Sequence, residues 1–126
     1  MTPQPSTENE AVVRVRNGPL VAPVLSRVVG MLAARAQCPV DRLDDALLVA
    51  DAIAAHAPRR SANGHVTVRL TAGGDGLELR VLDLTPGGGD GLVADAALPG
   101  VGNVLERIAD DVHVEDDELV VRLSFG

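Results

Sequence analysis

The residues of this chain that could do chemistry lie mainly between positions 77 and 105. An alternating, strand-like run ends at Asp83, and a glycine-rich segment containing Gly87 follows it. Further along, Gly100 and Gly102 precede a run with helical spacing. A carboxylate at the end of a strand can accept hydrogen bonds from a base or a sugar, and bare N–H groups at a glycine turn can hold phosphate. This order of features predicts a nucleotide site.

Each of these signals also has an ordinary structural interpretation. Asp83 can be a turn residue that caps its own loop, and Gly100 and Gly102 can simply make a tight entry to a helix. The alternation of the preceding strand nevertheless places Asp83 on the same inward face as Leu79 and Val81. A buried carboxylate needs a hydrogen-bond donor, which an adenine amino group or an ordered water would supply.

Hydrophobic periodicity predicts the elements that must position these residues. Strands are expected at residues 11–16, 65–71, 77–83, 112–115 and 119–125, and helices at 20–37, 41–57 and 101–110. Residues 87–98 are expected to form a flexible loop, and Pro58 to end the second helix. The consecutive hairpins predict a mixed, mostly antiparallel sheet with helices on one face, which is an α+β two-layer sandwich.

Composition limits the classes of protein that this chain can represent. Its 126 residues, 46% of them hydrophobic, indicate a single domain over residues 11–126 after a disordered segment at residues 1–10. A net charge of −7 and a single aromatic residue, Phe125, argue against binding to nucleic acid or to an anionic membrane. The chain has no lysine, which excludes a Walker A lysine and a Schiff-base lysine.

Location and redox state follow from the same composition. Cys38 is the single cysteine, so no disulfide can form within the chain. The first ten residues are polar and lack the charged and apolar regions of a signal peptide. No apolar run approaches the roughly 18 residues that a membrane-spanning helix needs. A cytoplasmic location is therefore expected.

Three motifs carry a family resemblance over residues 11–125. A helix contains Asp51 and, four residues later, Ala55; a strand runs through Asp83 toward Gly87; and a segment with Gly100 and Gly102 opens a helix. In this order the chain resembles the anti-sigma regulatory factors and serine kinases of the histidine-kinase-like ATPase superfamily, which has the Bergerat, or GHKL, fold. The closing hairpin of residues 112–123 is similar to the terminal strands of that family.

The resemblance implies roles for individual residues. Asp83 would contact the adenine amino group, Gly87 would let the backbone approach the base, and Gly100 and Gly102 would line the phosphates. Asp51, at the position of the family's usual glutamate, would be the candidate catalytic base. From its own surroundings in the sequence, Asp51 can equally be a solvated helix acid.

The departures from the family pattern concern the metal. Ala55 stands where the family has the asparagine that holds magnesium, and a methyl group cannot coordinate a hard cation. Thr85 also replaces the first glycine after the aspartate. The resemblance thus implies ATP or ADP as the ligand. Ala55 argues against magnesium, and no residue is assigned as a metal ligand. Phosphoryl transfer depends on that metal charge, so we expect weak or absent nucleotide binding and little or no kinase activity.

Three functions remain open at this point. The first is an anti-sigma-type regulatory domain that binds a sigma factor or a STAS-type antagonist protein, and for which the resemblance also implies a homodimer. The second is an active ATP-dependent serine protein kinase that phosphorylates such an antagonist, with Asp51 as base. The third is an interaction domain that has lost both nucleotide and sigma-factor binding.

Overall fold

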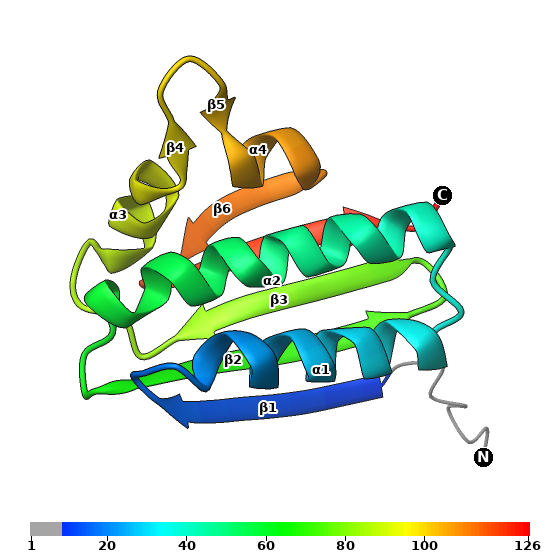
Figure 1. The fold of residues 1–126 in the computed structure, drawn as a ribbon, viewed down its shortest axis with the longest axis horizontal. Coiled ribbons are helices and arrows are strands. Elements are labelled where there is room, and N and C mark those ends of the chain that lie inside the picture. Colours follow the sequence, from blue (N-terminus) through cyan, green and yellow to red (C-terminus); the bar gives the residue numbers. More distant parts are fainter. Residues whose placement is uncertain (1–8) are drawn as a thin grey trace.

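The computed structural model describes residues 9–126 as one sheet covered by helices, with a small additional hairpin (Figure 1). The strands of the sheet are β1 (Asn9–Arg16), β2 (His65–Gly73), β3 (Gly76–Leu82), β6 (Asp111–Glu115) and β7 (Glu118–Ser124). The helices are α1 (Val21–Arg35), α2 (Val40–Arg60), α3 (Gly88–Asp95) and α4 (Val104–Ile108). Two short strands, β4 (Ala97–Leu98) and β5 (Gly102–Asn103), form the hairpin.

The sheet has the strand order β1-β2-β3-β7-β6, and each pair of neighbouring strands is antiparallel. The helices α1 and α2 lie side by side over one face of this sheet, and α3 and α4 lie beyond α2 on the side of β6 (Figure 1). The expected α+β class, with a mostly antiparallel sheet and helices on one face, is confirmed.

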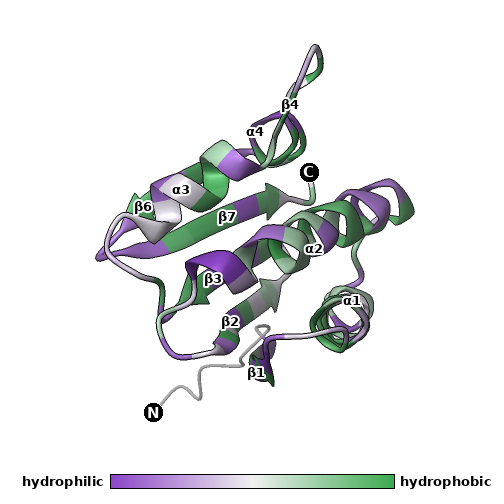
Figure 2. Ribbon diagram, turned by 60° about the vertical axis from the view of Figure 1, so that its left-hand side comes forward, coloured by the Kyte–Doolittle hydropathy of each residue, from purple (hydrophilic) through white to green (hydrophobic). Residues whose placement is uncertain are grey.

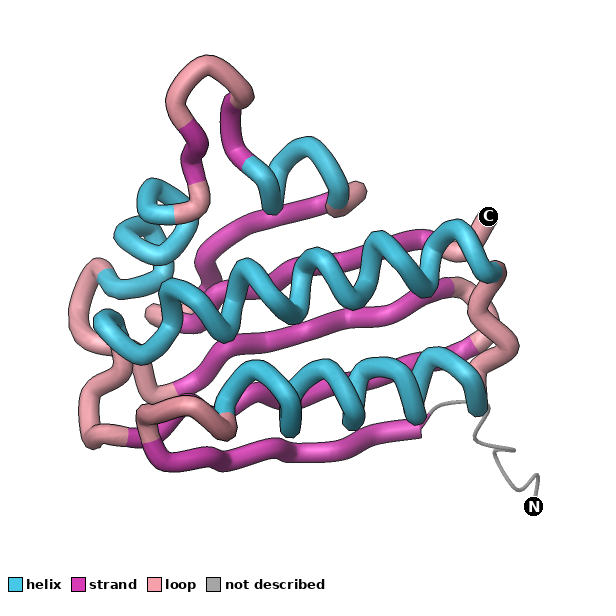
Figure 3. Tube along the Cα trace, viewed as in Figure 1, coloured by secondary structure: helices cyan, strands magenta, loops and turns pink. Residues whose placement is uncertain are grey.

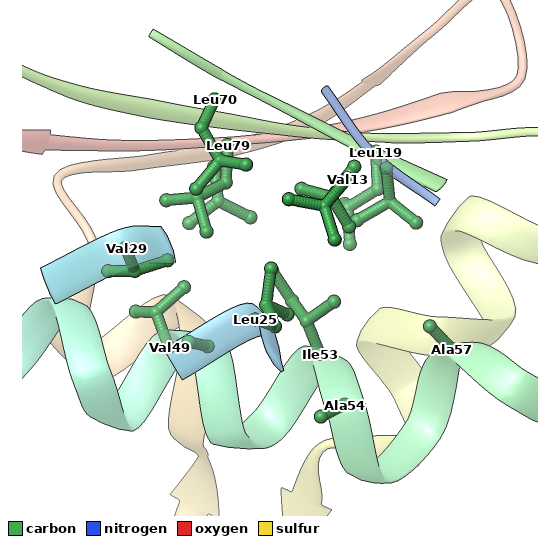
Figure 4. Close-up of a cluster of buried hydrophobic side chains, with 14 of the residues drawn as sticks. Val13, Leu25, Val29, Val49, Ile53, Ala54, Ala57, Leu70, Leu79 and Leu119 are labelled. Carbon is green, nitrogen blue, oxygen red and sulfur yellow. The ribbon is translucent and has the colours of Figure 1, made fainter. Parts of the chain in front are cut away.

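A single aliphatic core lies between the helices and the sheet. Figure 4 shows Leu25 of α1 and Ile53 of α2 pointing toward Leu70 of β2 and Leu79 of β3, and all four side chains are buried. In both long helices the residues of one side are buried, such as Leu25 and Val29 in α1 and Val49 and Ile53 in α2, and Figure 2 shows hydrophilic residues along the rest of α2. This division is what places the two helices on the same face of the sheet.

The opposite face of the sheet is charged. The Arg80 guanidinium on β3 lies 3.1 Å from a Glu118 carboxylate oxygen, and Arg122 on β7 donates to Glu78 at 2.8 Å. Alternation along the strands places these side chains away from the helices. The hydrogen bond that Arg80 donates to Glu118 raises the pKa of Arg80, and the one that Arg122 donates to Glu78 raises the pKa of Arg122.

Two predictions are wrong, one about the end of α2 and one about residues 87–98. Helix α2 continues past Pro58 to Arg60, because Pro58 lies in the last turn, where its missing N–H removes only one helical hydrogen bond. Residues 88–95 form α3 instead of the expected flexible loop. The buried residues Gly88 and Gly89 let this helix approach its neighbours closely, and an added Cβ at Gly89 would lie 2.9 Å from a methyl group of Val114.

The start of the chain differs slightly from expectation. Strand β1 begins at Asn9, so the last two residues of the predicted disordered segment are ordered in the sheet. The rest of that segment, residues 1–8, lies outside the described residues. None of the helices in the described part of the chain is long and apolar enough to cross a membrane.

Candidate functional site

Asp83 lies at the turn that follows β3. The strand ends at Leu82, and Asp83 has a left-handed backbone conformation with φ of 54° and an exposed side chain. The expectation that Asp83 faces inward is therefore wrong, because the left-handed residue ends the alternation of the strand. Its backbone carbonyl accepts a hydrogen bond from the Ala62 N–H at 2.7 Å, which ties the turn to the end of α2.

Gly87 lies four residues further on, at the start of α3. It is the N-cap residue, with φ of 74°, and no atom lies within 4 Å of the position where a Cβ would be. The loop between Asp83 and Gly87 is held by Thr85, whose N–H donates to the Arg60 carbonyl oxygen at 2.8 Å. Asp83 and Gly87 therefore lie at the two ends of one short loop, and both are exposed.

Gly100 and Gly102 belong to the β4–β5 hairpin, which projects from the body of the molecule (Figure 3). Both have positive φ, at 76° and 102°, as their place in a tight connection requires. Helix α4 begins only at Val104, with the Asn103 side chain accepting from the Glu106 N–H at 3.2 Å. The helix predicted over residues 101–110 is thus shorter than expected, and the two glycines shape a hairpin before it.

Asp51 and Ala55 lie on the exposed side of α2. The Ser26 hydroxyl of α1 donates to an Asp51 carboxylate oxygen at 3.2 Å. Helix α1 lies on the opposite side of α2 from α3, α4 and the β4–β5 hairpin (Figures 1 and 2). The structure therefore does not bring Asp51 together with Gly100 and Gly102.

A cluster that the sequence did not reveal lies between α2 and α3. Arg60 donates from Nε and Nη2 to the two carboxylate oxygens of Asp95, at 2.9 Å and 3.0 Å. This hydrogen bond lowers the pKa of Asp95 and raises that of Arg60. One turn before Arg60, the His56 Nδ1 atom is buried and has no hydrogen-bond partner among the described residues. No local pattern in the sequence indicated this cluster, because Arg60 and Asp95 lie 35 positions apart.

Helix α3 packs tightly onto this cluster. A Cβ added at Gly91 would lie 2.6 Å from the guanidinium carbon of Arg60, and one added at Gly88 would lie 3.0 Å from the Thr85 hydroxyl oxygen. The two-pronged contact between Arg60 and Asp95 fixes the rotation of α3 against α2 as well as its distance. The segment expected to be a mobile loop is therefore attached at a defined place.

The α2 residues assigned by the resemblance do not fit a magnesium nucleotide. Ala55 offers no oxygen ligand, and the Asp51 carboxylate accepts a hydrogen bond from Ser26 of α1. The exposed residues Asp83, Gly87 and Gly100 remain accessible to a ligand. Among the residues that the resemblance assigns, none is placed to activate a nucleophile or to hold the metal.

A groove of about 500 Å³ lies elsewhere, at the end of the sheet where β2 turns into β3. Its charged lining includes Asp75, Glu78, Asp111 and Arg122. None of the residues assigned to nucleotide binding lines this groove. The groove and the assigned residues are therefore separate features of the molecule.

Comparisons with known proteins do not assign this chain to a family. No protein-family model matches the sequence, and no curated protein matches it significantly. The family resemblance accordingly stays a prediction that depends on the motifs quoted above.

Proposed function

We propose that this chain is a regulatory domain of the anti-sigma type, with the histidine-kinase-like ATPase (Bergerat) fold, and that it acts by binding other proteins. The order of elements supports this proposal: two helices follow the first strand, a hairpin leads to the Asp83 turn, and a second hairpin closes the antiparallel sheet. In this proposal the segment from Asp83 to Gly102 descends from a nucleotide pocket.

The single observation that favours binding over catalysis is the position of Asp51. This carboxylate accepts a hydrogen bond from Ser26 and faces α1, away from the glycines that would line the phosphates. A general base must come within hydrogen-bond reach of the proton that it abstracts. Together with Ala55 at the metal position, this supports a domain that binds nucleotide weakly or not at all.

The proposed partner is a sigma factor or a STAS-type antagonist protein. With a net charge of −7, this chain is suited to a partner that presents basic surface. The proposal also includes a homodimer and a cytoplasmic location. The alternative function is an active serine kinase, and the following experiments distinguish it from the proposed one.

Nucleotide binding is tested by thermal unfolding with ATP and magnesium. A ligand at 100 times its dissociation constant stabilises the folded state by about 2.7 kcal/mol. We expect little or no rise in the midpoint at millimolar ATP. Because the chain has no Trp or Tyr, circular dichroism is the appropriate signal. If a rise does occur, Asp83→Asn should abolish it when Asp83 binds the base, and Asp90→Asn is the matched control on the same segment.

Partner binding is tested by incubating the purified chain with candidate sigma factors and STAS proteins. A stable complex with either class, formed equally well without ATP, is the expected result. Labelled phosphoserine on a STAS protein would replace the proposal with the kinase. An absence of binding to all candidates would favour a domain that has lost both activities.

A further inference from the structure

Strand β1 is a long strand at one edge of the five-stranded sheet. Each of its eight residues pairs with β2, from Asn9 opposite Ala72 to Arg16 opposite His65. On its other side no strand pairs with it among residues 9–126. A regular, unpaired strand edge is a template for pairing with another chain unless charges, bulges or a covering segment protect it.

The side chains of β1 that face away from the helices form an ordered charge pattern. Glu10, Val12 and Arg14 alternate along this face, all three are exposed, and 57% of the Val12 surface is accessible. On the other face Val13 is buried in the core. Arg16 is exposed on the same face. From Glu10 to Arg14 this face therefore presents an acidic, an apolar and a basic side chain, with the apolar one in the middle.

We propose that β1 pairs antiparallel with β1 of a second copy, with Val12 on the two-fold axis. In this register Glu10 lies opposite Arg14 of the second copy, and Arg14 lies opposite its Glu10. The two Val12 side chains then contact each other across the axis. Opposite charges and apolar side chains directly across an antiparallel pair both stabilise it. The contact is isologous, so it closes at a dimer.

The other edge of the sheet lacks this complementarity. Strand β6 has five residues, and an antiparallel pair centred on His113 would place Asp111 opposite Glu115 of the second copy. Like charges directly opposite each other are destabilising. These two carboxylates already lie 2.8 Å and 3.3 Å from the two ring nitrogens of His113 within the chain. Repulsion between carboxylates thus disfavours pairing of β6 with a second copy, whereas the charges on β1 favour such pairing.

The proposed function includes a homodimer, and the β1–β1 contact would be its interface. In that respect this inference rests on the proposed function. Strand β1 lies at the edge of the sheet far from β6, α3 and α4 (Figure 1). Changes on β1 therefore leave the segment from Asp83 to Gly102 untouched. A failure of the dimer and a failure of sigma-factor or nucleotide binding can be distinguished, because each is measured separately.

The first test reverses the charges of the full-length chain and measures its mass by light scattering over a range of concentrations. The unmodified chain should reach twice its monomer mass. Glu10→Arg and Arg14→Glu should each raise the dimer dissociation constant about tenfold, because each turns two attractive pairs into two repulsive ones. The double variant should restore the dimer. Arg107→Glu on α4 makes the same charge change far from β1 and should have no effect.

A mixture of the two single variants provides a sharper readout. The Glu10→Arg chain carries two arginines and the Arg14→Glu chain carries two glutamates, so together they should form a heterodimer more readily than either forms a homodimer. Circular dichroism of each variant checks that it is folded.

A disulfide tests the register. In a Cys38→Ser background, Val12→Cys should oxidise to a covalent dimer, because Cα atoms facing across an antiparallel pair lie about 4.5–5.5 Å apart. Arg16→Cys, far from the axis, should not. A chain that is monomeric at every concentration would overturn the inference, as would a dimer insensitive to both charge reversals. Assemblies that keep growing would indicate β1–β6 contacts and would also overturn it.

Discussion

Arg60 joins three segments at the end of α2. Its guanidinium holds Asp95 of α3, while its carbonyl oxygen accepts the N–H of Thr85 from the loop after β3. One residue thus ties α3 and the Asp83 loop to α2. No local pattern indicated this, because Asp95 lies 35 positions away in a segment whose glycine content predicted a loop.

The first prediction concerns the pH dependence of this ion pair. The hydrogen bond from Arg60 lowers the pKa of Asp95 in the folded state below its value in the unfolded chain. Its contribution to stability is therefore present above the unfolded value of about 3.9 and is lost as the pH falls through the folded value. Asp95→Asn should lower the unfolding midpoint at pH 7, and the difference from the unmodified chain should disappear in strong acid.

Thermal unfolding followed by circular dichroism from pH 2 to pH 7 measures this difference. Asp90→Asn removes a carboxylate from the same helix and serves as the control, with a smaller expected effect from the helix dipole alone. Equal midpoints for Asp95→Asn and the unmodified chain at pH 7 would show that the ion pair contributes nothing.

At the scale of elements, the β2–β3 hairpin joins the second strand of the sheet to its middle strand through Gly74 and Asp75. The strands expected at residues 65–71 and 77–83 placed a hairpin connection in this segment, and the structure has it there. Gly76 has a second role that its sequence position does not reveal. A Cβ at Gly76 would fall on the carbonyl oxygen of Leu123 in β7, because the two strands approach closely there.

The second prediction compares Gly76 with Gly74, which lies in the same hairpin. Gly76→Ala should destabilise the fold by about 1–3 kcal/mol, since backbone atoms of β7 must move. Gly74→Ala should change the free energy of unfolding by less than about 1 kcal/mol, because no atom lies within 4 Å of its Cβ position. Urea unfolding followed by circular dichroism measures both. Equal effects would contradict the close approach of β3 and β7.

On the scale of the whole molecule, one aliphatic core holds the helix layer on the sheet. Leu79 lies at its centre, on the middle strand of the five, and is paired with Leu70 and Val121. Its side chain has no accessible surface and points toward Ile53 of α2 (Figure 4). A smaller side chain at this position would therefore weaken packing in both the helix layer and the sheet.

The third prediction concerns this core. Leu79→Ala should lower the free energy of unfolding by about 2–5 kcal/mol, through lost burial and the remaining cavity. Leu48→Ala on α2 is the matched control, because half of the Leu48 surface is accessible and the change should be within about 0.5 kcal/mol. Urea unfolding gives both values. A small effect at Leu79 would mean that the two layers do not share this core.

The sequence by itself determined the elements whose signals are local. Alternation along β2, β3 and β7, the helical spacing of α1 and α2, and the turn residues between strands were sufficient to predict the α+β class and the antiparallel sheet. Such patterns are set by the geometry of one strand or one helix, so they can be recognised without a partner.

Only the tertiary structure decided where the candidate site residues lie. Asp83 turns outward because its backbone is left-handed, and Asp51 faces α1 because α2 is rotated to place Ile53 in the core. Residues 88–95 become a helix because their glycines pack against α2 and β6. Each of these outcomes depends on contacts between segments far apart in the chain, and a local pattern carries no information about them.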